Sequence, residues 1–454
     1  MHGRSRLPPA LRGLTGPALV GLLVSVTLMV VAMAICAVFN WDVHVKSFPP
    51  LHAEWDPRWG PGTVPSVLVA GITLVYGRRF AAAAGWGRLL LGAYGLGIAW
   101  MVSLATVDGW DGIGVILQSN YEYLRTARKI TSLADVSTML HEYVARIDYD
   151  NPAHWPVHLA GHPPGAVLFF VLLVALGLGG GLAAGWVVIA LAATTPVAVL
   201  ITLRTLGAES SARSAAPFLV VGPAAIWMAV SADAMFAAVA AWGLTCLAVA
   251  ATRSTSRATA LWALLTGLLL GYCALLSYGL PALGVLALAV LVAARNLRPL
   301  PWAAASAVAV VMAFALAGFS WWEAFPVLRE RYSRGVSQDR PTSYWIWGNL
   351  AALSFSAGPV VGAAVAQALS RVKATWRHRS QERVVVVVTV AAVITIALVD
   401  LSGMSRGEVE RIWLPFVPWL LVGTALLSER WRRIALPLQV VLALVVQHLL
   451  FTGW

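Results

Sequence analysis

The chain has 454 residues, of which 59% are hydrophobic and only 11% are charged. An average soluble domain carries about 25% charged residues, so this composition excludes an ordinary soluble protein of this length. The net charge is +12, but most Lys and Arg residues flank apolar blocks, where the positive-inside rule for membrane proteins places them. Nucleic acid is therefore not predicted as a partner.

Long apolar blocks follow one another from about residue 17 onward. A membrane-crossing helix needs roughly 20 apolar residues, and in hydrocarbon each segment must satisfy its own backbone hydrogen bonds. The sequence therefore predicts an all-α polytopic transmembrane bundle of about 13 spans, with residues 1–454 as one domain. Arg4, Arg6 and Arg12 precede the first block, which we expect to be an uncleaved span of a multi-pass plasma-membrane protein.

Polar segments interrupt the apolar blocks, and the charge bias places three of them on the external side. They are a first loop at 40–62, a long loop at 108–162 and an Arg-rich loop at 319–345. Within the long loop, apolar residues recur with helical spacing over 132–147, which predicts an amphipathic helix along the membrane surface. Ser132, with Asp135 three residues on, is a suitable helix cap.

A glycine-rich run at 177–181 lies inside the next apolar stretch. It predicts a broken or half-crossing helix, because glycine interrupts helices. The run has no strand before it and no Lys-Ser/Thr after it, so a nucleotide-binding loop is excluded.

Two carboxylates, Asp108 and Asp111, stand where a span is expected to meet external water. A carboxylate in that position is suited to act as a general base toward an acceptor hydroxyl. The alternative is helix termination, because Asp-Gly is a common turn. Asp42 in the first loop is a reserve candidate for the same role.

A histidine-rich segment precedes the next apolar stretch. His162 is followed directly by two prolines, which would hold it rigidly at a helix start, where it could donate to a phosphate oxygen or relay a proton. The alternative is a proline-capped helix with an incidental histidine. His154, His158 and His162 are spaced by four, but Pro156 and Pro163 break the helical register, so no metal site is predicted.

Arginines are concentrated in the loop at 319–345, on the side that short loops normally keep free of them. Arg331, Arg334 and Arg340 are suited to bind a phosphate through their forked guanidinium groups. The alternatives are a solvated loop and an anchor to lipid headgroups.

A second charged run leads into one of the last spans. Glu408 and Arg411 are three residues apart and could pair on one helix face, either structurally or at a substrate site. Asp233 is a lone acid between two apolar stretches and a further candidate.

Taken together, these motifs resemble the GT-C superfamily of membrane glycosyltransferases, such as the polyprenyl-phosphate-dependent mannosyl- and arabinosyltransferases. The likeness rests on Asp108 and Asp111 after an early span, on the long loop with its helix, and on His162-Pro163-Pro164 before the next span. It covers the first half of the chain better than the second. One additional hairpin before the core and the spacing of the two aspartates depart from the family pattern and leave open which carboxylate is the base.

The resemblance implies transfer of a sugar from a polyprenyl-phosphate carrier to a hydroxyl of an external glycan, lipid or protein acceptor, in synthesis of the cell envelope. Asp108 or Asp111 would deprotonate the acceptor, while His162 and the arginines, Arg411 included, would stabilise the departing phosphate. No cofactor is required, although some relatives use a divalent metal ion. A transporter or lipid flippase, and a non-catalytic scaffold, are the alternative classes.

Overall fold

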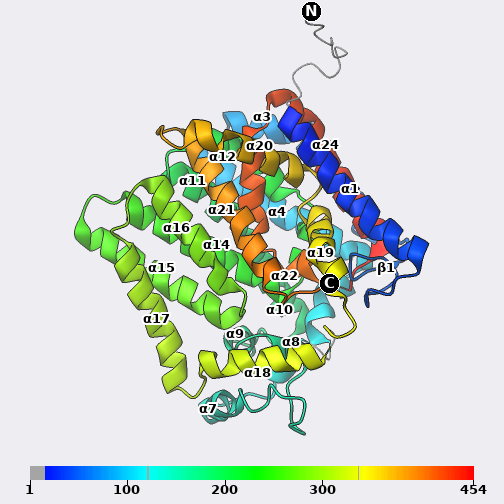
Figure 1. Ribbon diagram of the computed structural model, residues 1–454, viewed down its shortest axis with the longest axis vertical. Coiled ribbons are helices and arrows are strands. Elements are labelled where there is room, and N and C mark those ends of the chain that lie inside the picture. Colours follow the sequence, from blue (N-terminus) through cyan, green and yellow to red (C-terminus); the bar gives the residue numbers. More distant parts are fainter. Residues whose placement is uncertain (1–15, 120–121, 336, 454) are drawn as a thin grey trace, which may run out of the picture.

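The computed structural model describes residues 16–119, 122–335 and 337–453, and helices make up most of this part of the chain (Figure 1). A short antiparallel pair joins the strands β1 (Glu54–Trp55) and β2 (Leu450–Phe451). This pair fastens the segment that follows the first helix to the C-terminal end. The predicted all-α helical architecture is confirmed.

The chain is a helical membrane protein, because eight of its helical stretches, 21 to 25 residues long, are apolar enough to cross a bilayer. They are α1 (Gly16–Phe39), α2 (Thr63–Ile72) continued by a π-helical turn (Thr73–Gly77) and α3 (Arg78–Ala83), α4 (Trp86–Ala105) with the turn after it, α10 (Gly181–Ala192) with α11 (Thr194–Thr205), α14 (Ala232–Thr252), α15 (Ser256–Leu276), α21 (Gln381–Leu401) and α24 (Glu429–Leu449). Arg4, Arg6 and Arg12, expected before the first span, lie outside the described residues.

Two further helix pairs are long and apolar enough only when each pair is taken together, and each is sharply bent, as in a broken span or a re-entrant loop. α17 (Leu300–Leu316) and α18 (Trp321–Arg334) meet at 76°, and α19 (Thr342–Ser356) and α20 (Val360–Thr375) meet at 107°. Counting each bent pair once gives up to ten spans in the described part of the chain. Because bends and breaks divide the apolar blocks, their total length does not fix the number of crossings, and the count of about 13 stays a prediction.

Shorter helices connect these spans. The ones with apolar sequences are α9 (Gly165–Ala175), α16 (Leu283–Ala294) with the 3-10 turn before it (Leu280–Ala282), and α23 (Val417–Leu421) with the 3-10 turn after it (Val422–Leu426). The remaining ones are α5 (Asp111–Gly114), α6 (Tyr123–Ala127), α7 (Leu133–Glu142), α8 (Val157–Gly161), α12 (Glu209–Val220), α13 (Ala225–Met228) and α22 (Val409–Ile412). The predicted helix break at the glycine run is confirmed, because α9 ends before it and α10 begins at its last glycine.

The centre of the bundle is α14, which is buried over most of its length and packs against α11, α15 and α16. Small residues allow this close packing, as is usual between helices in membranes. On α15, Gly267 and Gly271 face α17 so closely that an added Cβ would lie 2.3 Å from the Ala303 carbonyl oxygen and 2.8 Å from Ala307 Cα. α15 and α17 therefore touch backbone to backbone.

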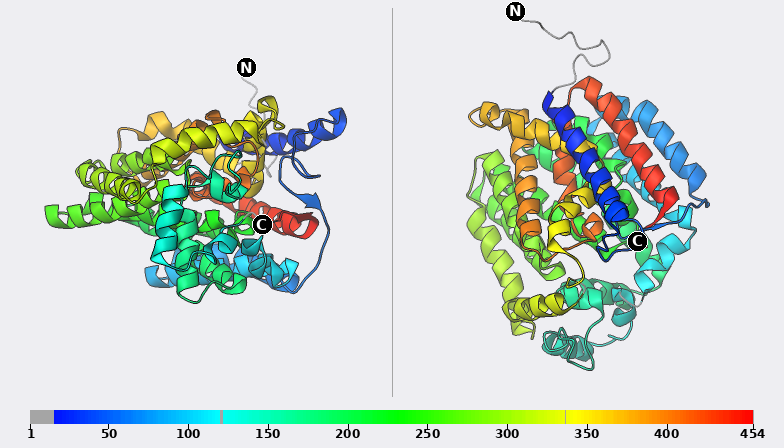
Figure 2. Two further views of the ribbon diagram at one scale, coloured as in Figure 1. Left: turned by 90° about the horizontal axis from the view of Figure 1, so that it is seen from below. Right: turned by 45° about the vertical axis from the view of Figure 1, so that its right-hand side comes forward.

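The two ends of the bundle differ in character. α7, α8 and α18 gather at the lower end in Figure 1, and the α7 segment projects from it, whereas α3 lies at the upper end (Figure 1, Figure 2). The predicted cap of α7 is confirmed: the backbone N–H of Asp135 donates to Ser132 Oγ over 3.1 Å, and that of Ser132 to Asp135 Oδ2 over 2.9 Å. The helix ends at Glu142, earlier than predicted, because the buried Tyr143 turns toward the carbonyls of Leu159 and His162.

The segment 319–345, expected to be a loop, is mostly helical. α18 occupies most of it and α19 begins at Thr342, which leaves only a short connection between them. α18 has an aromatic face, because Trp321 and Phe325 stack at 5.3 Å between ring centroids and both contact Tyr278. This apolar face hidden among the charged residues explains why the segment folds as a helix.

Candidate functional site

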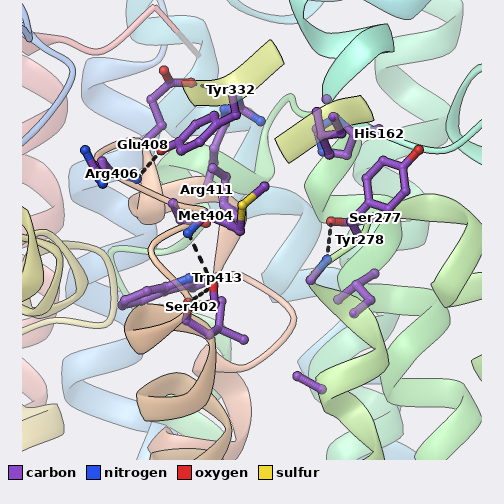
Figure 3. Close-up of a pocket in the computed structure, with 18 of the residues that line it drawn as sticks. His162, Ser277, Tyr278, Tyr332, Ser402, Met404, Arg406, Glu408, Arg411 and Trp413 are labelled. Atoms are coloured by element: carbon purple, nitrogen blue, oxygen red, sulfur yellow. Dashed lines mark hydrogen bonds and ion pairs between the residues drawn. The ribbon is translucent and has the colours of Figure 1, made fainter. Parts of the chain in front are cut away.

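A cavity of about 360 Å³ lies among α8, α18, the turn before α16 and the segment that carries α22 (Figure 3). Its lining includes charged and polar aromatic side chains, namely His162, Tyr278, Tyr332, Arg340, Arg406 and Glu408. It also includes apolar side chains, namely Leu280, Leu328, Leu398, Ile412, Trp413 and Phe416. A cavity lined by both kinds of side chain is suited to an amphipathic ligand.

Arg411, which also lines the cavity, is the centre of a buried ion-pair network. Its Nη1 lies 2.7 Å from Asp233 Oδ2 and its Nη2 lies 2.8 Å from Glu408 Oε2. Asp233 stands at the start of α14 and Arg411 on α22, so the fold joins groups that are 178 residues apart in sequence. Both side chains are at most 6% exposed, and at that depth a charge persists only when it is paired.

Glu408 connects this pair to a second arginine. Its Oε1 lies 3.4 Å from Nη1 and from Nη2 of Arg340, which also donates to the carbonyls of His44 and Arg406. Burial alone would raise the pKa of Glu408, but Arg411 and Arg340 outweigh it and hold that pKa well below its ordinary value. Glu408 is therefore an ionised bridge between two cavity-lining arginines.

Arg406 lines the same cavity but has no carboxylate within 4.0 Å among the described residues. Its Nη1 donates to the carbonyls of Ser337, over 2.8 Å, and Arg340, over 3.2 Å. Its Nε is buried and makes no hydrogen bond within the described part of the chain. A guanidinium held by neutral carbonyls keeps its full charge available to an anion.

His162 faces this cluster across the cavity (Figure 3). It sits between α8 and α9, and its Nδ1 lies 2.8 Å from the His158 carbonyl oxygen. A carbonyl only accepts, so Nδ1 carries the hydrogen and Nε2 keeps a lone pair in the neutral ring. Burial lowers the pKa of His162, so the ring is neutral at pH 7 and able to accept a proton.

A second histidine, His158, also lines the cavity and extends the network. His158 Nδ1 lies 2.8 Å from Glu122 Oε1, and its Nε2 lies 3.2 Å from Arg411 Nη2. Glu122 is 5% exposed. The contact between His158 and Arg411 connects the long segment 108–162 to α22, and it adds a third partner of Arg411 to Asp233 and Glu408.

Glu410 is next to Arg411 but lies outside the cavity lining. Its Oε1 accepts from the backbone N–H of His52 over 3.1 Å, while its Oε2 is buried without a partner among the described residues. Burial raises the pKa of Glu410 to about 7. This carboxyl group therefore fastens the first loop to α22 and is close to half protonated near neutral pH.

The aspartates predicted as the base lie elsewhere. Asp108 forms an ion pair with Arg58, and its Oδ2 accepts from Gln447 Nε2 over 2.9 Å. Asp111 is exposed at the start of α5, and Asp42 accepts from the His44 backbone N–H over 2.7 Å in a separate pocket of the first loop. None of these three carboxylates lines the cavity that contains His162.

The three arginines predicted to bind phosphate also separate. Only Arg340 lines the cavity. Arg331 donates to the Ile147 carbonyl over 2.5 Å and to the Trp155 carbonyl over 2.9 Å, and it is buried by these contacts. Arg334 pairs with two acids of the long segment, one of them Asp150 at 3.1 Å. Arg331 and Arg334 therefore hold the long segment against α18.

Of the predicted site residues, the fold brings His162, Arg340, Glu408 and Arg411 to one cavity, with Asp233 directly behind it. Arg406 was not predicted, although it stands in the same charged run as Glu408 and Arg411. The described residues contain no group of three or more His, Cys, Asp or Glu side chains arranged to hold a metal ion. Comparisons with protein-family models, with curated proteins and with solved structures find no match for the chain.

Proposed function

We propose that this chain is a membrane glycosyltransferase that moves a sugar from a polyprenyl-phosphate carrier to an acceptor hydroxyl at the external face of the plasma membrane. One observation carries the proposal. The cavity joins Arg406, a cation without a carboxylate partner in the described part of the chain, to a neutral histidine and to an apolar wall. A phosphate ester with a long hydrocarbon tail would match this lining, because its phosphate suits the cation and its tail suits the apolar residues.

The donor would place its phosphate at the charged residues of the cavity and its hydrocarbon tail at the apolar ones. Arg340 and Arg406 would hold its phosphate, because guanidinium groups offer forked donors to phosphate oxygens. The first isoprenoid units of the carrier would lie along the apolar wall formed by residues such as Leu398, Trp413 and Phe416. The acceptor would approach from the side of His162.

The reaction has a simple balance of bonds and charges. The bond between the sugar C1 and the phosphate oxygen breaks, and the acceptor oxygen bonds to C1. The proton of the acceptor hydroxyl passes to Nε2 of His162. The phosphate leaves with one additional negative charge, which Arg340 and Arg406 stabilise, and preorganised cations of this kind usually supply a large part of a rate enhancement.

The orientation is supported by the distribution of charge. Arg78 contacts Glu429 at the start of α24, which also pairs with Arg432 and Arg433, so basic residues from two span ends come together. Figure 1 places α3 at the end of the bundle opposite α8 and α18, near which the cavity lies. By the positive-inside rule the cavity would then be near the external surface.

A transporter shares the spans but is expected to place polar groups along its helices at mid-membrane depth. Here three buried charged groups stand near element ends: Asp233 begins α14, Asp400 is in the last turn of α21, and Arg411 lies on the short α22. This clustering favours chemistry at one surface over passage through the bundle.

The test is an assay of membranes containing the chain with a panel of radiolabelled polyprenyl-phosphate sugars and an envelope acceptor fraction. A glycosyltransferase yields label in an acid-labile glycosidic product, with release of the polyprenyl phosphate. Movement of an intact donor between leaflets without any product would instead identify a flippase. The absence of both outcomes for every donor would refute the proposal.

A further inference from the structure

A second crevice, of about 260 Å³, lies between the α2–α3 stretch, α4 and α12. Its walls are almost wholly apolar and include Ile72, Tyr76, Phe80, Leu89, Leu96 and Val220. The hydroxyl of Thr73, which also lines it, is satisfied by the Val69 carbonyl at 2.7 Å. The crevice shares no residue with the cavity at α22. Its apolar walls are suited to a hydrocarbon chain, which makes no hydrogen bonds.

The crevice is reached from the bilayer. Three of its residues lie on the outer surface of a membrane-length stretch, where Ile72 is 55%, Tyr76 62% and Phe80 44% exposed. One wall is the π-helical turn Thr73–Gly77, and π-helical turns are rare and often occur at functional sites. The molecules that reach such an opening are lipids.

Positive charge collects next to one wall of the crevice, the α2–α3 stretch. Arg78 follows the lining residue Gly77 directly and contacts Glu429. The same carboxylate lies 3.2 Å from Arg432 and 3.5 Å from Arg433. Among the described residues no other carboxylate is within 4.0 Å of these three guanidinium groups. The single negative charge of Glu429 therefore leaves a net positive charge on this cluster.

We propose that this site binds an anionic phospholipid, with its phosphate among Arg78, Arg432 and Arg433 and one acyl chain in the crevice. The selectivity between phospholipids comes from the headgroup, because an apolar crevice accepts the acyl chain of any of them. The crevice fixes where the chain lies. The site is independent of the proposed transferase reaction.

The experiment is native mass spectrometry of the full-length protein in detergent, titrated with dioleoyl phosphatidylglycerol and with dioleoyl phosphatidylcholine. We expect discrete binding of the first lipid and only weak binding of the second. One arginine near a lipid headgroup contributes about a fivefold change in affinity, so Arg433→Gln should lower affinity about fivefold and Arg78→Gln with Arg433→Gln about 25-fold. Arg433 is 68% exposed, which protects the fold of the single variant.

The controls separate this site from general charge attraction. Arg257→Gln with Arg298→Gln removes two exposed arginines outside the crevice and should leave affinity unchanged. Leu96→Trp, which fills the crevice, should weaken binding of the dioleoyl lipid but not of a dihexanoyl analogue. Equal losses in both arginine pairs, competition by inorganic phosphate alone, or no effect of Leu96→Trp would overturn the proposal.

Discussion

The buried pair between Asp233 and Arg411 allows a quantitative test of how the site is held together. Asp233→Asn keeps the shape of the side chain but removes its charge, and Arg411 loses the partner of its 2.7 Å contact. Removing one member of a buried pair usually costs about 3–5 kcal/mol. We expect about 3 kcal/mol here, the lower end, because Glu408 still neutralises Arg411 at 2.8 Å.

The assay is thermal unfolding in detergent, followed with a thiol-reactive fluorophore. Cys36, Cys246 and Cys273 are free and buried, so they react only when the bundle opens. Asp148→Asn is the matched control, because Asp148 pairs with Arg334 at the surface, where solvent screening leaves an ion pair little effect on stability.

Equal shifts of the unfolding temperature for the two variants would refute the reasoning about burial.

Three further outcomes are expected. A cysteine at Asp150, which is 78% exposed, should react with an impermeant thiol reagent in intact cells, and one at Lys373 should not; the reverse pattern would contradict the external placement of the site. His162→Ala should lower transfer by about 10²–10⁴-fold, whereas Asp108→Asn should retain most of it, and the opposite result would restore the aspartate as base. Burial raises the pKa of Glu410 to about 7, so folding favours its protonated form. Stability should therefore fall as pH rises from about 4.5 to 7. Glu410→Gln should abolish this pH dependence of the unfolding temperature.

Local sequence signals predicted those parts of the structure that depend on neighbouring residues. The Ser132 and Asp135 cap and the helix break before Gly181 need only a few adjacent side chains. His162 was placed at a helix start because two prolines follow it. Each of these predictions used interactions within one or two turns of chain.

The rest of the site depends on distant partners, which a single sequence does not display. Asp108 forms an ion pair with Arg58 and accepts a hydrogen bond from Gln447, the second of them 339 residues away. Arg331 and Arg340 stand in one segment and look alike in sequence, yet the first holds loop carbonyls and the second lines the cavity. The two arginines differ because Arg331 lies on the helix α18 and Arg340 lies after its end. The sequence did not predict this helix, because charged residues interrupt its apolar pattern.

The central claim is that Arg406 binds the phosphate of the donor, and its most direct test compares Arg406 with Arg334 at matched expression. Lysine keeps the charge but loses the forked donor geometry. We expect Arg406→Lys to reduce sugar transfer clearly, Arg406→Ala to reduce it about 10²–10³-fold, and Arg334→Lys to leave it unchanged. Full transfer activity in Arg406→Lys and Arg406→Ala would contradict the claim.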